Sequence, residues 1–405
     1  DDKEFKSLKY NPHESGNKFL VFDAVPLSVP AFCPKCQAKD FVKNGSHDRQ
    51  IQDLNYKGYN IYINIKGTRY KCKNCGKTFL NTFDCVESNS HMTVRLKDKI
   101  RSEAKNKTFT EIAAKYGIHE NTVKVIFGEY ILEQEAKRKL YSPEIIEIAT
   151  TCIYKKKCPV IADVIGNQII EVLADDSKES FVKYFQRLPE HQNIKTVVIE
   201  MKDNYKEAIA EALPDAEIVV EKNYVMNEVN NELEYIRQKN IPKKKSRDFA
   251  IPAHVQTEVL STSVKCMDDG QKETLYAIQN KYPDVAYAYY FKEAIRQMYD
   301  TYSNTSDAKK FLNDFWKQIP VDCASLTVFE YCIVENWINE ICNYFDYINR
   351  PKVRKSPFTH SDMCDLIKYI NLKGHGYQYD VFRAKLLFSS EAARLAVYRD
   401  EEYTD

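Results

Sequence analysis

The sequence predicts a multidomain α/β protein, and three features of its 405 residues support this fold class. Two Cys-x-x-Cys pairs near the start enclose a segment that alternates bulky and polar residues, as strands do. A segment with helical periodicity follows, and after Ser142-Pro143 short β-branched runs alternate with helical ones. Residues 224–345 then carry helical signals with almost no strand signal, so we expect a helical insertion that interrupts the α/β core.

The two cysteine pairs predict a zinc ribbon in residues 31–90, after an N-terminal segment of residues 1–30. Two residues between the members of each pair let both thiolates face one point, and two such turns supply the four tetrahedral ligands that zinc prefers. The residues between the pairs indicate strands joined by a turn at Lys57-Gly58. Because four protein thiolates leave no open coordination position, we expect structural Zn²⁺. The expected ligands are Cys33, Cys36, Cys72 and Cys75.

The composition is that of an intracellular protein without membrane spans. Hydrophobic residues make up 43% and charged residues 29% of the chain, and no apolar run is long enough to cross a bilayer. The cysteines outside the ribbon show no framework spacing, which favours a reducing compartment over a disulfide-stapled secreted protein. We therefore expect a cytoplasmic protein.

Charge is unevenly distributed along the chain. The whole chain carries a net charge of +1, whereas residues 31–142 hold 21 Lys and Arg against 12 Asp and Glu. This segment therefore carries a net charge of +9, which indicates a module that binds a polyanion. A solvated basic surface without a partner is the alternative that charge alone leaves open.

Residues 91–142 have the pattern of a helix-turn-helix. We expect Thr110 to cap the first helix, Ile112 and Tyr116 to face inward, and Gly117 to make the sharp turn before a second helix. An ordinary helical hairpin uses the same apolar spacing, but the neighbouring ribbon and the basic charge favour DNA binding. The start of the second helix offers base-edge contacts from His119, Glu120, Asn121 and Lys124. Phosphate contacts are expected from Arg49, Lys66, Arg69, Lys105, Lys107 and Lys115.

From residue 143 onward the pattern predicts an RNase H-like α/β core. Three antiparallel strands precede alternating helices and strands, and Gly166-Asn167 makes a hairpin turn. The expected strands are 145–153, 160–165, 168–173, 196–201 and 216–220, and the expected helices are 177–187 and 205–213. Residues 143–223 form the first part of the core, residues 346–390 its C-terminal helices, and residues 391–405 a tail.

Several stretches carry a resemblance to a known family. They are Tyr70-Lys-Cys-Lys-Asn-Cys-Gly-Lys-Thr-Phe79, Asp203-Asn-Tyr-Lys-Glu-Ala-Ile-Ala-Glu-Ala-Leu-Pro-Asp-Ala216, Tyr289-Tyr-Phe-Lys-Glu-Ala-Ile-Arg296, and Gly376 through Arg383. Together with the helix-turn-helix, they make residues 30–390 similar to transposases of the ISL-three insertion-sequence family. The resemblance implies binding to terminal inverted repeats, and strand transfer by an Asp-Asp-Glu triad that holds two divalent metal ions.

The chain departs from this family at the acid triad. The positions that match the three acids hold Ala149, Glu200 and Ser361, so a single carboxylate remains. Two-metal chemistry needs several anionic oxygens, whereas an alanine methyl ligates nothing and a serine hydroxyl is a poor neutral ligand. The candidate substitutes among nearby acids are Glu147, Asp163 and Asp362.

We therefore predict a transposase-derived, sequence-specific DNA-binding protein that has lost strand cleavage. The expected partners are double-stranded DNA, a second copy of the chain in a homodimer, and proteins bound through the core or the insertion; no membrane is expected. In a bacterial cell the DNA-bound form would be associated with the nucleoid. One alternative is an active transposase that uses Mg²⁺. Another is an interaction scaffold with non-specific affinity for nucleic acid.

Overall fold

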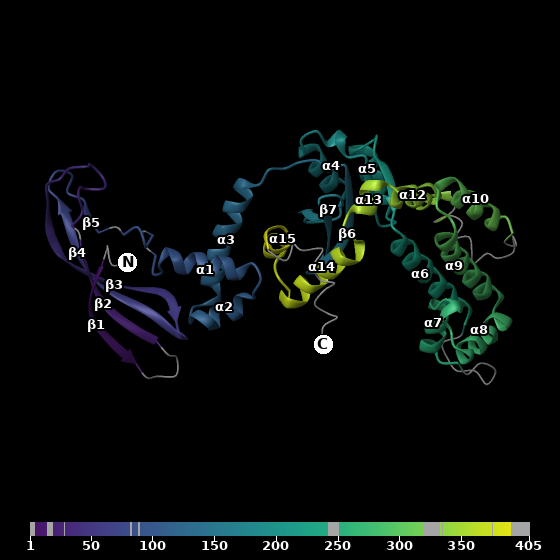
Figure 1. Ribbon diagram of the computed structural model, residues 1–405, viewed down its shortest axis with the longest axis horizontal. Coiled ribbons are helices and arrows are strands. Elements are labelled where there is room, and N and C mark those ends of the chain that lie inside the picture. Colours follow the sequence, from purple (N-terminus) through teal and green to yellow (C-terminus); the bar gives the residue numbers. More distant parts are fainter. Residues whose placement is uncertain are drawn as a thin grey trace. The chain divides into compact units, whose positions relative to one another are not determined.

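The computed structural model describes residues 5–13, 19–27, 29–81, 83–87, 90–241, 251–318, 333, 335–374 and 376–389. The chain divides into two compact units, the first ending at Arg138 and the second beginning at Lys139. Figure 1 labels their elements in chain order. The tail predicted for residues 391–405 lies outside the described residues.

The first unit is built on a five-stranded sheet. Its strands are β1 (Phe5–His13), β2 (Phe19–Pro26), β3 (Phe41–Tyr56), β4 (Tyr59–Cys72) and β5 (Thr78–Leu80). The order is β1-β2-β4-β3, and β5 pairs with β4. β3 and β4 form an antiparallel hairpin, and its turn residues Lys57 and Gly58 have positive φ. Because β2 pairs in parallel with β4, the predicted N-terminal segment adds two strands to the sheet of the ribbon.

Three helices complete the first unit: α1 (Val94–Ala104), α2 (Phe109–Tyr116) and α3 (Glu120–Lys137). Gly117 ends α2 at a φ of 63°, and a Cβ there would lie 2.9 Å from Asn60 Nδ2, so the turn requires glycine. The predicted cap at Thr110 is wrong. Thr108 caps α2, because Glu111 three residues later completes a reciprocal capping box with it.

Side-chain amides connect the hairpin to the helix-turn-helix. Gln52 Nε2 donates to the Tyr116 carbonyl at 2.6 Å, and Asn55 Nδ2 donates to the Lys115 carbonyl at 3.0 Å. Both carbonyls belong to the last turn of α2, where a helix has no internal donors to offer. Two residues of β3 therefore cap the C-terminal end of α2.

A buried carboxylate makes a second connection between the hairpin and the helices. Asp53 on β3 accepts hydrogen bonds from Thr93 Oγ1 and Arg95 Nε, both at 2.7 Å. Thr93 is also the N-cap of α1. These contacts join the predicted ribbon of residues 31–90 to the predicted helix-turn-helix of residues 91–142 within one compact unit.

The second unit contains another five-stranded sheet, in the order β10-β9-β6-β7-β8. The strands are β6 (Ile145–Ile153), β7 (Lys156–Asp163), β8 (Gln168–Val172), β9 (Thr196–Ile199) and β10 (Glu217–Val220). β6, β7 and β8 are antiparallel, while β9 and β10 run parallel to β6. Helices α4 (Lys178–Arg187) and α5 (Asp203–Ala212) connect the later strands. This is the predicted RNase H-like order of elements.

Helices α4 and α5 pack on one face of this sheet, and the helical insertion joins their apolar cluster. Its helices are α6 (Lys222–Asn240), α7 (Ala253–Ser261), α8 (Asp269–Lys281), α9 (Pro283–Thr301), α10 (Thr305–Trp316) and α12 (Ile338–Ile348). Ile146 and Ile148 of β6 belong to the same apolar cluster as Val229 of α6 and Ile341 of α12. The insertion therefore shares its core with the sheet.

The opposite face of the sheet is covered by the C-terminal helices α13 (Pro351–Lys355), α14 (His360–Gly374) and α15 (Tyr379–Phe388). Alternation along β6 sends Ile145 and Ala149 into an apolar cluster with Met363 of α14 and Phe382 of α15. The sheet is thus covered on both faces. Among the described residues, no helix is long and apolar enough to cross a membrane.

Candidate metal centre, nucleic-acid interface and acid positions

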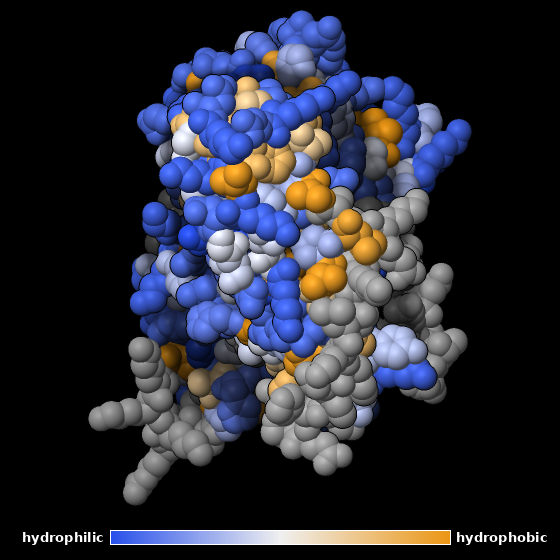
Figure 2. Space-filling view, turned by 90° about the vertical axis from the view of Figure 1, so that its left-hand side faces the viewer, coloured by the Kyte–Doolittle hydropathy of each residue, from blue (hydrophilic) through white to orange (hydrophobic). Residues whose placement is uncertain are grey.

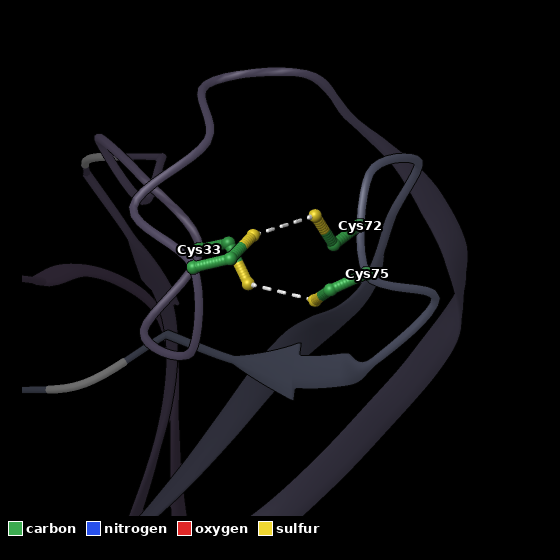
Figure 3. A group of neighbouring side chains, drawn as sticks. Cys33, Cys72 and Cys75 are labelled. Atoms are coloured by element: carbon green, nitrogen blue, oxygen red, sulfur yellow. Dashed lines mark hydrogen bonds between the residues drawn. The ribbon is translucent and has the colours of Figure 1, made fainter.

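Two backbone knuckles of the first unit bring four cysteine sulfurs together (Figure 3). The Sγ atoms of Cys33 and Cys75 lie 3.7 Å apart, and those of Cys36 and Cys72 lie 3.5 Å apart. Four thiolates around a tetrahedral zinc, each with a Zn–S bond of about 2.3 Å, would be separated by about 3.8 Å. The sulfur positions therefore fit the predicted structural zinc ion, with all four coordination positions filled by protein.

The two knuckles have the same backbone design. Gln37 N donates to the Cys33 carbonyl at 2.9 Å, and Gly76 N donates to the Cys72 carbonyl at 3.0 Å. The residue after the second cysteine of each pair takes a positive φ, 59° at Gln37 and 69° at Gly76. Glycine adopts this conformation freely, whereas glutamine adopts it at a cost in free energy.

Aromatic rings form a small core beneath the cysteines. Phe41 makes edge-to-face contacts with Tyr70 and Phe79, at ring-centroid distances of 5.5 and 5.3 Å. Tyr70 and Phe79 are buried in one cluster with Cys33 and Cys72. So small a cluster cannot hold the ribbon alone, which explains why the fold needs a metal at this end.

The N-terminal turn of α3 presents an exposed polar surface. His119 caps the helix, because its Nδ1 accepts from Asn121 N at 3.1 Å. Glu120 Oε1 forms an ion pair with Lys124 Nζ at 3.1 Å, and Glu120 Oε2 accepts a hydrogen bond from Thr110 Oγ1 at 3.2 Å. Three of the four predicted base contacts are therefore already engaged in local bonds, while the side chain of Asn121 is exposed.

Sequence reasoning missed one residue on this helix. Val125 is 62% exposed, although it lies between the buried Val123 and Phe127. It shares a helix face with Asn121, four residues earlier. An exposed apolar side chain beside polar ones can contact a thymine methyl group, which polar residues read poorly. The spacing of apolar residues along α3 gave no signal for it, because Val125 falls among core positions.

Two lysines predicted to contact phosphates share an acidic partner. Glu103 at the end of α1 pairs with Lys115 at 2.6 Å and with Lys107 at 3.6 Å. Burial disfavours the charged form of Glu103, but the hydrogen bond and the charge of Lys115 hold its pKa below the usual value. Lys105 instead lies over the ring of Tyr130, 4.9 Å from its centroid. These lysines therefore contribute to the packing of α1 on its neighbours.

The basic residues predicted to contact DNA from the ribbon differ in whether their charged groups already contact other groups of the protein. Arg49 donates to the Ser90 carbonyl. Lys66 lies 3.9 Å from Asp23, in an exposed and therefore weak pair. Arg69 is exposed on β4. Figure 2 shows that the coloured part of the face turned toward the viewer is mainly hydrophilic, with some hydrophobic side chains gathered in its upper part.

A polar network in the second unit surrounds the carboxylate of Glu200, just after β9. Glu200 accepts from the Thr150 backbone N–H at 2.6 Å and pairs with Lys202 Nζ at 2.6 Å. Lys202 also donates to Thr150 Oγ1 at 2.7 Å, and that hydroxyl lies 2.8 Å from the hydroxyl of Tyr205. Both oxygens of Glu200 are thus bound by donors of the chain.

Comparison with known proteins agrees with this organisation. Residues 30–75 match the zinc-finger of transposase IS204/IS1001/IS1096/IS1165, and residues 83–131 match the helix-turn-helix domain of transposase family ISL3. Residues 146–351, half of the chain, match the transposase domain of the same family. The chain belongs to the ISL3 transposase family.

A curated relative of the ISL3 chain is the transposase for insertion sequence element IS1001 of Bordetella parapertussis. The two proteins are 22% identical over 226 residues. The match covers 55% of this chain and 55% of the relative, so the chain spans about half the length of the protein it matches.

Two of the three positions predicted from the sequence to match family acids hold neutral residues, and the structure places these two residues in different surroundings. Ala149 is 2% exposed and packs in the apolar cluster between the sheet and the C-terminal helices. Ser361 is exposed in the first turn of α14, with its hydroxyl 3.5 Å from Asp365. Glu200 supplies the remaining carboxylate, and Lys202 adds a positive charge beside it. These donors do not fit a pair of divalent cations, which need shared anionic oxygens.

The three candidate substitute acids are engaged elsewhere in the ISL3 core. Glu147 bonds to His360. Asp163 accepts from the backbone N–H groups of Ile165 and Gly166 in the hairpin turn, and from the hydroxyl of Tyr141. Asp362 is bonded to Thr359 at the start of α14. All three carboxylates are therefore bonded to other groups of the chain, Asp163 and Asp362 to nearby residues and Glu147 to the distant His360.

Strand register separates Asp163 from Glu200. Asp163 pairs with Ile146, whereas Thr150, which contacts Glu200, pairs with Pro159. Four residues along a strand correspond to about 13 Å. Among the described residues, the four cysteines are the group whose side chains come together as metal ligands.

Sequence reasoning also missed two residues beside the acid positions. Lys202 follows the matched acid by two residues, and its charge was the signal that could have found it. His360 precedes Ser361, but nothing in its spacing pointed to Glu147, which is 213 residues away. Both residues act through contacts that chain folding creates.

Proposed function

We propose that this chain is a transposase-derived protein that binds specific duplex DNA and no longer cleaves it. The observation that carries the proposal is the pairing of Glu200 with Lys202 and the Thr150 amide, beside neutral residues at the other two acid positions. The ammonium group of Lys202, beside Glu200, repels the divalent cations that the family chemistry requires. The first unit has the four cysteine ligands and the helix-turn-helix that DNA binding would need.

Recognition is assigned to the exposed start of α3. Asn121 and Lys124 are placed to contact base edges, and Val125 to contact a thymine methyl. Arg49, Lys66 and Arg69 of the ribbon, with the lysines around Glu103, would supply phosphate contacts. Specific binding would then require the sheet, the zinc centre and the helices together.

We further propose that the protein acts as a homodimer in the cytoplasm of a bacterial cell. Inverted-repeat sites have two-fold symmetry, and two copies of one reading unit match such a site on two half-sites. The second unit, which keeps a folded core and a large helical insertion, would provide dimer or partner contacts.

The first experiment selects duplexes from a random pool with the full zinc-loaded protein. A single enriched sequence with inverted symmetry is the expected outcome. Binding that shows no preference among sequences and falls steeply with salt would instead support a scaffold with non-specific affinity.

The second experiment incubates the selected duplex with protein and Mg²⁺ or Mn²⁺. No nicking or joining is expected, and Glu200→Ala should bind the duplex with unchanged affinity. Cleavage that Glu200→Ala abolishes would overturn the inactive assignment, and would identify an active transposase that uses Glu200 with Glu147, Asp163 or Asp362.

A further inference from the structure

Three side chains of the second unit form a chain of contacts between α14 and β6. Cys364 Sγ lies 3.3 Å from His360 Nε2, and His360 Nδ1 bonds to Glu147 Oε1. One helical turn separates Cys364 from His360, so both side chains share a face of α14. A sulfur, an imidazole and a carboxylate in this order form the arrangement that activates a cysteine as a nucleophile.

We propose that Cys364 is a nucleophilic thiol and a modification site for small peroxides, with His360 and Glu147 as positioning residues. This inference is independent of DNA binding. It concerns a position on α14 three residues after Ser361.

The surroundings of His360 favour an imidazolium. Burial alone would lower the pKa of His360, but the hydrogen bonds to Cys364 and Glu147 and their charges raise it to about 10. The side chains of His360 and Glu147 are 12% and 3% exposed, so solvent ions screen this pair weakly. A cation 3.3 Å from the sulfur stabilises a thiolate, which is the nucleophilic form of cysteine.

Tyrosines and carboxyl groups from neighbouring elements also face this cluster. The ring of Tyr224 on α6 meets His360 edge-on at a centroid distance of 4.5 Å. Burial raises the pKa of Glu221 at the start of α6, and raises that of Tyr344 on α12 to about 12. The full set around the cluster is Glu200, Glu221, Tyr224, Tyr344 and Tyr347.

The geometry supplies both partners that a peroxide reaction needs. The Cys364 thiolate attacks one peroxide oxygen, so an S–O bond forms while the O–O bond breaks. The leaving hydroxide or alkoxide takes the proton from His360 Nε2 and departs as water or alcohol. The sulfur is oxidised to a sulfenic acid, and the peroxide is reduced. Cys364 is partly exposed, which suits a small oxidant.

The test compares cysteines within one protein. The full zinc-loaded chain is treated with hydrogen peroxide at pH 6 to 8, sulfenic acids are trapped with dimedone, and each peptide is quantified by mass spectrometry. Cys152 and Cys266 are exposed and serve as internal controls. Cys364 should react about tenfold faster than either control, and its advantage should grow as the pH falls. Equal or slower reaction at Cys364 would overturn the proposal.

Two variants separate positioning from packing. His360→Asn should bring the rate of Cys364 to that of Cys152 and shift its pH profile to that of an ordinary thiol. Glu147→Gln should lower the rate less, because it keeps a hydrogen-bonding side chain. Ser361→Ala, on the exposed side of the same helix, should leave rate and profile unchanged. An unchanged pH profile in a folded His360→Asn protein would also refute the assignment.

Discussion

The two units of this protein differ in how their fold relates to the residues of their functional sites. The first unit has four cysteines in sulfur positions that fit zinc, and a helix-turn-helix whose second helix is α3. The second has the predicted strand order and a covered sheet, and we propose that Ala149, Ser361 and the lysine-bound Glu200 stand where the family has acids. In the first unit the metal is part of what holds the fold, whereas in the second the apolar core holds it. Acids in the second unit could therefore change without loss of the fold.

The largest predicted effect follows from removing one zinc ligand. Cys72→Ser should abolish zinc retention and weaken specific DNA binding at least about 100-fold, because metal binding supplies much of the folding free energy of such ribbons. Metal content and duplex affinity are the measurements. Tryptophan fluorescence should still show cooperative unfolding of the second unit, where both tryptophans, Trp316 and Trp337, lie. Cys266→Ser is the matched control, and one retained zinc in the ligand variant would contradict the assignment.

The next effect concerns base recognition. Asn121→Ala and Lys124→Ala should each reduce specific affinity by about 1–3 kcal/mol while changing non-specific affinity less. Lys137→Ala, at the far end of α3, provides a control that removes the same charge. Equal losses on specific and random duplexes in competition binding would place α3 outside the major groove.

The two units should respond to pH in opposite directions. Burial would raise the pKa of Asp53, but hydrogen bonds from Arg95 and Thr93 lower it, so this stabilisation exists above the ordinary value and is lost as the pH falls below it. The pKa of His360 is raised to about 10, so its stabilisation is complete below its ordinary value of 6.5 and is lost as the pH rises toward 10. Zinc release follows the first unit and tryptophan fluorescence the second. Glu147→Gln should flatten the alkaline loss, and an unchanged alkaline profile would refute the role of this pair.

A smaller effect is expected from replacing Glu103, the acidic partner of Lys107 and Lys115. Glu103→Gln should destabilise the first unit by about 1 kcal/mol, because Lys107 and Lys115 lose a charged partner. The freed lysines should also make DNA affinity fall more steeply with salt. Thermal unfolding and salt titration measure the two changes. Glu133→Gln, which removes a more exposed partner of Arg101, is the control and should change neither.

The smallest effect tests the equivalence of the knuckles. Gln37→Gly should stabilise the zinc-bound ribbon by about 1 kcal/mol, because glycine relieves the positive φ that Gly76 already accommodates. Gly76→Ala should have the opposite sign. The rate of zinc transfer to a chelator reports both changes, and equal rates in the wild type and the two variants would contradict the role of the positive φ at these turns.

Local pattern predicted much of this molecule. The cysteine spacing predicted the four ligands, Gly117 predicted the turn, and alternation predicted the core strands within a few residues. Apolar spacing does not distinguish Thr108 from Thr110 as the N-cap of α2, whereas the reciprocal bonds between Thr108 and Glu111 do. Spacing could not reveal the bonds of Gln52 to Tyr116 or of His360 to Glu147, since these depend on distant segments meeting.

The hairpin of β3 and β4 separates the zinc centre from α2 by a fixed length of strand. β3 begins at Phe41, opposite Cys72, and reaches Gln52 beside α2. At about 3.3 Å per residue, this stretch measures about 36 Å, close to the roughly 34 Å of one turn of duplex DNA. The number of strand residues between the zinc centre and α2 thus sets the distance between them. Paired insertions would lengthen this distance in steps, whereas a single insertion would turn the side chains of the strand to the opposite face.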